Sequence, residues 1–168
     1  MKLSEVKMFP QLRYSVDIPL GQLKSTIDKY IEEGVQLNPD FQRGRVWSHE
    51  QRVNYVEFML RGGSTGNQIY FNHPHWMGTF EGEFVLVDGL QRILALLSFI
   101  EEDLLVFECE TYSSLKDRFK NFVSLRFNVC CLQTKYEVID WYLLMNEGGV
   151  VHTKEELDRV KSLREYYR

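Results

Sequence analysis

The sequence predicts an α+β fold with a helical C-terminal segment. Helical periods of apolar residues alternate along the chain with short apolar runs of strand length. Hydrophobic residues make up 44% and charged residues 26% of the 168 residues, an ordinary globular balance. No repeat, low-complexity tract or Pro/Ser linker interrupts this pattern. One domain is therefore expected over residues 1–168, with its core at about 18–132 and C-terminal helices at about 134–168.

The first helix is predicted at residues 20–33, where apolar residues recur on one side and Gly34 ends the element. An extended piece follows at residues 35–38. The apolar stripe of this helix consists of Leu20, Leu23, Ile27, Tyr30 and Ile31.

Ser48 begins the second predicted helix, because Gln51 three positions later completes a capping box. Gly62-Gly63 ends this helix. Residues 69–72 and 83–87 are predicted strands, and turn-forming residues between them favour a hairpin-like connection. The inward stripe of the second helix consists of Val53, Val56 and Leu60.

The apolar period becomes helical again at residue 90, with Ile93, Leu94, Leu97 and Ile100 on one face. Residues 104–108 are predicted as a strand, 114–122 as a short helix and 123–132 as an extended run. Two further capping-box pairs begin helices at about 135–147 and 154–167; they are Thr134 with Glu137 and Thr153 with Glu156.

The bulk properties narrow the class of protein. The net charge of -4 argues against a protein that coats nucleic acid non-specifically. The odd count of three cysteines favours free thiols in a reduced compartment over disulfides. No apolar run approaches the length of a membrane span, and the charged N-terminus does not resemble a signal peptide. A cytoplasmic protein with no membrane partner is therefore expected.

The strongest local motif is Asp-Gly-Leu-Gln-Arg at residues 88–92, where a predicted strand turns into a helix. A helix N-terminus offers unpaired N–H groups and a positive dipole end, which favour anions. Gly89 allows close approach of a phosphate, and Arg92 can add a charged contact. Asp88 can orient Arg92 or hold a metal-bound water. The alternative is that Asp88 caps the helix and Arg92 makes a surface ion pair.

A second motif spans residues 38–47, in which Arg43 and Arg45 surround a glycine between Phe41 and Trp47. Aromatic rings can stack on a base, and arginine can stack or chelate phosphate. The alternative is a loop that the two aromatic residues pin to the core, with both arginines in solvent.

The third motif, residues 146–153, lies between the last two predicted helices. Asn146 and His152 could line a site there, or the segment could be only a connector. The pair His73 and His75 lacks a cysteine or carboxylate at the usual ligand spacing, so no metal site is predicted.

In this order the three motifs resemble the N-terminal domain family of GmrSD-type modification-dependent restriction endonucleases, within the wider ParB/sulfiredoxin-like superfamily. The resemblance runs from about residue 18 to the C-terminus. The chain is similar to short solitary versions of this domain in bacteriophages and mobile elements. Its motifs are Phe41-Gln42-Arg43 with Val46-Trp47, the 88–92 motif, and Asn146 with Gly148-Gly149, His152-Thr153 and Glu155-Glu156-Leu157.

The resemblance implies a ParB-like small mixed sheet surrounded by helices, and a site that binds and hydrolyses a nucleoside triphosphate with Mg²⁺. Asp88, Gln91 and Arg92 would be catalytic. The other implied ligand-binding residues are Gln42, Arg43, Arg45, Gly89, Asn146, Gly149, His152 and Thr153.

Three functions follow as hypotheses. The first is a nucleotide-dependent switch or NTPase in conflicts between phage or mobile elements and their hosts. The second is a DNA-binding or DNA-nicking protein, supported by Arg43, Arg45 and Arg52. The third is a non-catalytic protein that interferes with a host or phage complex. Enzymes of this family carry a nuclease domain with a His-Asn-His motif after this part, and these 168 residues contain none, so self-contained DNA cleavage is not expected.

Overall fold

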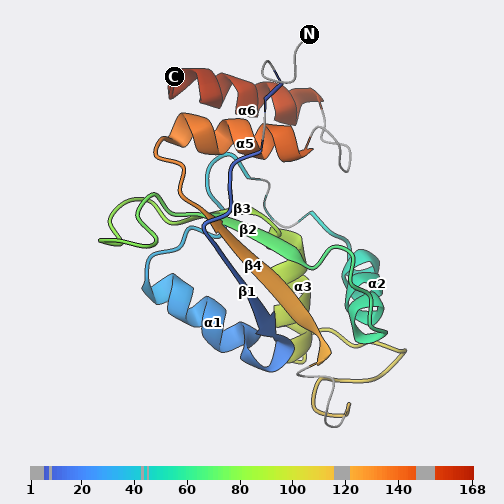
Figure 1. Cartoon of the computed structure of the whole chain (residues 1–168). Coiled ribbons are helices and arrows are strands. Elements are labelled where there is room, and N and C mark those ends of the chain that lie inside the picture. Colours follow the sequence, from blue (N-terminus) through green and yellow to red (C-terminus); the bar gives the residue numbers. More distant parts are fainter. Residues whose placement is uncertain (1–5, 8, 43, 45, 116–121, 147–153) are drawn as a thin grey trace.

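A computed structural model describes residues 6–7, 9–42, 44, 46–115, 122–146 and 154–168 (Figure 1). Strands and helices mix along the described chain, which confirms the α+β prediction. The strands are β1 (Tyr14–Pro19), β2 (Gln68–Asn72), β3 (Val85–Asp88) and β4 (Ser124–Cys130). The helices are α1 (Leu20–Glu32), α2 (His49–Leu60), α3 (Leu90–Ile100), α5 (Lys135–Asn146) and α6 (Lys154–Tyr166).

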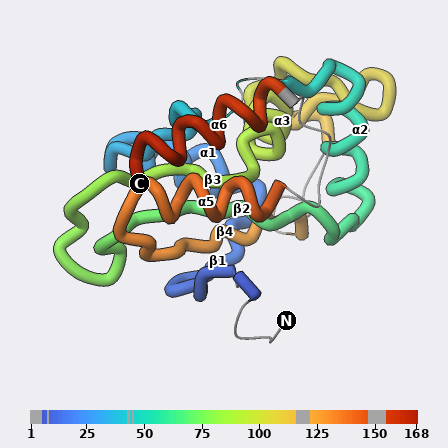
Figure 2. Tube along the Cα trace, turned by 90° about the horizontal axis from the view of Figure 1, so that it is seen from above, coloured from blue at the N-terminus to red at the C-terminus, as the bar shows by residue number. Residues whose placement is uncertain are grey.

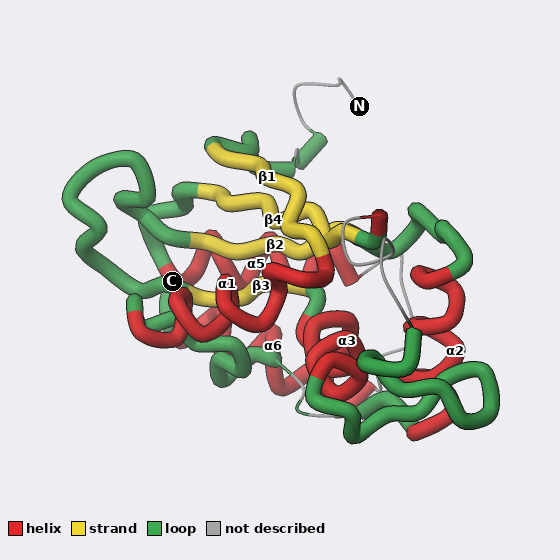
Figure 3. The backbone as a smooth tube through the Cα atoms, turned by 90° about the horizontal axis from the view of Figure 1, so that it is seen from below, coloured by secondary structure: helices red, strands yellow, loops and turns green. Residues whose placement is uncertain are grey.

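The four strands form one mixed sheet in the order β1-β4-β2-β3 (Figure 3). The β1–β4 and β2–β3 pairs are antiparallel, whereas β2 and β4 run parallel. The hairpin-like connection predicted between β2 and β3 is thus confirmed. Strand β1 was not predicted from the sequence. Gln36, in the extended piece after α1, adds a parallel bridge to Val85 at the outer edge of β3.

The sheet separates two layers of helices (Figure 1, Figure 2). Alternate residues of one strand point to opposite faces, so Leu86 joins the core under α1, α2 and α3, while Val85 and Val87 join the core under α5 and α6. The first core also contains Ile69, Phe71, Leu125, Phe127 and Val129, whereas the second contains Cys130, Trp141, Tyr142 and Val160.

The predicted face of α3 was only partly correct, because all four of its residues pack on the first core but Ile93 alone among them is fully buried. Ile93 is buried, but the neighbouring buried positions are Leu96 and Phe99, and Leu94 and Leu97 are only partly buried. This helix is apolar almost all round, so a single stripe could not be chosen from the period. The predicted stripe of α1 is confirmed at four of its five positions. The exception is Ile31, which is 52% exposed.

The strand predicted at residues 104–108 was wrong. Only Val106 pairs there, through an isolated antiparallel bridge to Glu110. Phe107 and Glu108 have φ values of 47° and 75°, so the chain turns where a strand would stay extended. Most of the predicted helix at 114–122 lies outside the described residues. No helix in the described part of the chain is long and apolar enough to cross a membrane.

Candidate functional site

The junction between β3 and α3 requires glycine at position 89. Gly89 is the N-cap of α3 and has a φ of 114°, in the left-handed region. A Cβ atom on Gly89 would lie 2.5 Å from Cδ1 of Ile69 in β2. The glycine therefore lets α3 begin directly against the neighbouring strand. The first intrahelical bond runs from the N–H of Ile93 to the carbonyl of Gly89, so the N–H groups of residues 90–92 precede the helical ladder.

Asp88 and Arg92 form an ion pair across the first turn of α3, between Oδ2 of Asp88 and Nη2 of Arg92. The Arg92 side chain is 18% exposed and that of Asp88 is 35% exposed. A partly buried pair is desolvated more than a surface pair, so it is held more firmly. This pair is compatible with orientation of Arg92 by Asp88 and equally with the alternative in which Arg92 makes an ion pair, but Asp88 does not cap α3, because the N-cap is Gly89 and no side chain caps it.

Gln91 holds the loop of the second motif. Its Oε1 accepts hydrogen bonds from the N–H groups of Val46 (3.1 Å) and Trp47 (3.3 Å). Its Nε2 donates to the carbonyl of Gly44 at 2.7 Å. One amide side chain therefore satisfies three backbone groups of a loop that has no regular secondary structure of its own.

Gln42 makes the reciprocal connection. Its Nε2 donates to the carbonyl of Leu86 in β3 at 2.8 Å. Leu86 lies two residues before Asp88, which is the last residue of β3. Hydrogen bonds of the two glutamines therefore connect the two motifs. Gln91 binds the backbone of the second motif, and Gln42 binds the backbone of β3, the strand that carries Asp88. This arrangement fixes the relative position of segments that are about 45 residues apart in the sequence.

A cleft of about 590 Å³ lies where these segments meet. One wall is aromatic, and the rings of Trp47 and Tyr55 meet at 5.2 Å in a T-shaped arrangement. The Tyr55 hydroxyl donates to the carbonyl of Gly66 at 3.0 Å. The ring of Tyr55 is therefore held by this hydrogen bond and by its contact with Trp47. The described lining residues are Gln42, Val46, Trp47, Tyr55, Phe58, Thr65, Gly66, Asp88, Gly89, Leu90, Gln91, Arg92, Tyr142, Met145 and Asn146.

Six of the predicted site residues line this one cleft: Gln42, Asp88, Gly89, Gln91, Arg92 and Asn146. They come from all three motifs. Asn146 closes the C-terminal end of α5, where its Nδ2 donates to the carbonyl of Tyr142 at 2.7 Å. The other five predicted residues lie outside the described part of the chain; they are Arg43, Arg45, Gly149, His152 and Thr153.

Sequence reasoning missed several lining residues. Tyr55 and Phe58 belong to α2, Thr65 follows it, and Tyr142 and Met145 belong to α5. The helical period of α2 places Tyr55 and Phe58 away from the predicted inward stripe that contains Val56. Aromatic residues outside the buried face of a helix could have indicated a binding surface.

Burial dominates the electrostatics of the tyrosines near the ion pair. Burial raises the pKa of Tyr55 well above its usual value, and the charge of Arg92 only partly opposes this. Burial also raises the pKa of Tyr70, and the negative charge of Asp88 adds to the effect. Both phenols therefore stay neutral at physiological pH; Tyr55 donates a hydrogen bond to the carbonyl of Gly66, and the ring of Tyr70 packs on Trp141.

The two histidines of the β2–β3 connection have separate environments. His73 is 1% exposed, its ring stacks on Phe80 at 4.1 Å, and its Nδ1 accepts from the N–H of His75. Burial lowers the pKa of His73. His75 lines another cavity, of about 360 Å³, near the start of α5. Among the described residues, no three His, Cys, Asp or Glu side chains gather as they would around a metal ion.

Comparison with known families confirms the family resemblance. Residues 23–140 match the family described as the GmrSD restriction endonuclease, N-terminal domain. The matched span contains the first two motifs and most of α5, and it ends before Asn146 and α6. Neither the curated proteins nor the solved structures gave a match. Because more than half of the chain is matched, the protein belongs to the family of GmrSD restriction endonuclease N-terminal domains.

Proposed function

We propose that the protein binds a nucleoside triphosphate in the cleft between α2, α3 and α5. The observation that carries this proposal is the meeting of two kinds of surface in one hollow. The N-terminus of α3 with Arg92 suits phosphate, and the aromatic wall of Trp47 and Tyr55 suits a base. A cleft of about 590 Å³ falls in the size range of small-molecule and cofactor sites.

The charges in the cleft indicate which other groups a triphosphate would need. Arg92 and Asp88 are the two ionised side chains among the described lining residues, and they pair with each other. A triphosphate therefore needs further positive charge. Arg43 and Arg45 would supply it, since their described neighbours Gln42 and Val46 line the cleft. Mg²⁺ bound to the nucleotide would supply the rest, and the Asp88 carboxylate is a hard oxygen ligand suited to hold it or its water.

Hydrolysis is the second step of the proposal. The described lining offers no serine, cysteine or histidine as a covalent nucleophile. Catalysis would rest on positioning and charge stabilisation, in which Arg92 faces the phosphates and Gln91 keeps the arginine-bearing loop in place. Gln91 would then be a positioning residue, because all three of its hydrogen bonds go to the backbone of the loop.

Calorimetry with the four ribonucleoside triphosphates and Mg²⁺ tests binding. Arg92→Gln should weaken the affinity at least about tenfold, because it removes a charged phosphate contact worth about 1.4 kcal/mol. Arg126→Gln is the matched control. Arg126 is an arginine that also pairs with an aspartate, Asp17, but it lies on β4 outside the cleft. No binding of any of the four nucleotides at about 1 mM would remove the proposal.

The family relationship supports a second, broader candidate, a role related to DNA restriction. Arg43 and Arg45 are the residues through which DNA phosphates would be bound. Retardation of DNA that weakens steeply with salt and is lost in Arg43→Ala would support direct DNA contact. Retardation that is unchanged in Arg43→Ala would place the DNA contacts elsewhere on the protein, and no retardation at all would assign any DNA-related role to a partner protein.

A further inference from the structure

The C-terminal helix α6 reaches back to the second motif through one side chain. Nη1 of Arg159 donates to the carbonyl of Asp40 at 2.6 Å, and its Nη2 donates to the carbonyl of Gln42 at 3.3 Å. The planar guanidinium fork suits two acceptors that lie close together. The backbone between these carbonyls is already a turn, since the N–H of Gln42 donates to the carbonyl of Pro39.

Other contacts hold the same turn from α5. Nζ of Lys135 donates to Oδ2 of Asp40 at 2.7 Å and lies 4.4 Å from the ring centre of Tyr167. Phe41, which lies between Asp40 and Gln42 in the chain, is 1% exposed, and its ring centre is 5.2 Å from that of Tyr142. The turn thus lies between β3, which it reaches through the Gln42 side chain, and the α5–α6 layer.

Helix α6 has few apolar contacts with the rest of the protein. Val160 is its buried residue among those described, and Leu157 and Leu163 are partly buried. Polar contacts at its surface therefore carry a larger share of its docking than they do for α3. Helix α6 also lies beyond residues 23–140, which match the family.

We propose that Arg159 is a positioning residue, through which α6 fixes the backbone that leads into Arg43. This inference rests on the proposed nucleotide site. The contacts of Arg159 with the turn and occupancy of the cleft are then coupled, because both favour one position of the turn. Thermodynamic linkage makes the coupling reciprocal, so a bound nucleotide stabilises these contacts.

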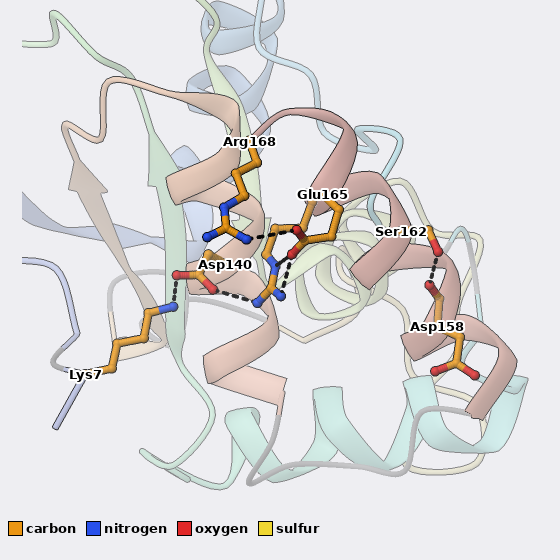
Figure 4. A network of polar contacts seen from close by, with 7 residues as sticks. Lys7, Asp140, Asp158, Ser162, Glu165 and Arg168 are labelled. Atoms are coloured by element: carbon orange, nitrogen blue, oxygen red, sulfur yellow. Dashed lines mark hydrogen bonds and ion pairs between the residues drawn. The ribbon is translucent and has the colours of Figure 1, made fainter. Parts of the chain in front are cut away.

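Arg164 provides a matched control on the same helix. Its Nη1 donates to Oδ1 of Asp140 in α5 at 3.1 Å, and it also pairs with Glu165. Asp140 and Glu165 belong to a polar network that includes Lys7 and Arg168 (Figure 4). Arg164 thus holds α6 to the protein without contacting the turn.

Nucleotide affinity is compared in Arg159→Ala, Arg159→Lys and Arg164→Ala. Arg159→Ala should raise the Kd about tenfold, and Arg159→Lys should recover only part of the loss because it cannot bridge both carbonyls. Arg164→Ala should keep the wild-type Kd even where its melting temperature falls as far as that of Arg159→Ala. A Kd that changes equally in the two alanine variants overturns the positioning role.

Hydrogen exchange separates this inference from the nucleotide proposal. Without any ligand, the amide of Gln42 should exchange faster in Arg159→Ala than in Arg164→Ala, because only the first variant loosens the turn. Equal exchange in both variants overturns the role of Arg159, whether or not nucleotide binds. Faster exchange together with no nucleotide binding in the wild type would keep Arg159 as the residue that fixes the turn and remove the proposed function alone.

Discussion

The two helical layers of this protein use the same sheet in different ways. The layer of α1, α2 and α3 covers a continuous apolar core, in which α3 contributes Ile93, Leu96 and Phe99 with no exposure to solvent. In the other layer, α5 covers the sheet and α6 covers α5, with Val160 as its buried residue among those described. Ion pairs such as Asp140 with Arg164 complete that second layer.

The cleft lies where the two layers meet, so its walls come from both layers. Asp88, Gln91 and Arg92 stand on the end of β3 and the start of α3, which belong to the well-packed side. Tyr142, Met145 and Asn146 come from the end of α5 on the other side. The shape of the cleft therefore depends on the packing of both layers against the sheet.

The largest expected effect tests the difference in packing directly. Leu96→Ala should lower the free energy of unfolding by about 3 kcal/mol, because it leaves a cavity in the first core. Val160→Ala should lower it by about 1.5 kcal/mol, since two buried carbon groups are lost. Urea denaturation measures both values. A larger loss in Val160→Ala would reverse the comparison between the layers.

A smaller effect is expected at the helix start. Gly89→Ala should destabilise the protein by about 2 kcal/mol, because alanine is strained at a φ of 114° and its Cβ would meet Ile69. Ile69→Val removes the Cδ1 atom that lies 2.5 Å from that Cβ. The double variant should therefore lose less stability than the two single losses added together. Simple additivity, measured by thermal unfolding, would show that backbone strain alone excludes a side chain at this position.

The smallest effect is a pH dependence on the α1 side of the sheet. Burial holds the pKa of His73 below its ordinary value of 6.5, so the unfolded chain binds a proton at a higher pH than the folded protein does. Stability should fall as the pH drops below about 6.5 and should be regained above it. His73→Phe should flatten this slope in urea denaturation between about pH 7.5 and about pH 5. His49→Gln, which removes an exposed histidine of α2, is the control.

Local signals predicted much of this fold. Ser48 and Gln51 form the capping box in both directions, and Thr134 with Glu137 do the same at α5. Such pairs depend on neighbours three residues apart, so the sequence carries the whole signal. Strand β1 escaped prediction because Ile18 is its one buried residue, so it lacks an apolar run, and because its partner β4 lies far along the chain. The turn at Phe107 and Glu108 escaped because neither residue is a usual left-handed former.

The candidate site was predictable in its members more than in their contacts. The Asp-Gly-Leu-Gln-Arg motif pointed to the strand–helix junction, and six predicted residues line the cleft there. The bonds of Gln42 and Gln91 to distant backbone groups could not be predicted, because no local pattern specifies a partner about 45 residues away. The motif at residues 38–47 indicated Trp47, but the other ring of the aromatic wall was missed because Tyr55 acquires its role only when α2 packs beside α3.

The pairing of β1 with β4 has a consequence for synthesis of the chain. The hydrogen bond between Ser15 and Asn128 joins residues 113 positions apart. A ribosome that adds about 5–20 residues per second needs roughly 6 to 20 s to cover that distance. Until then β1 lacks β4, the strand with which it pairs, and its backbone hydrogen-bonding groups stay unpaired. The sheet can close only after β4 has been synthesised, so agents that shield exposed strands during synthesis should raise the yield of native protein.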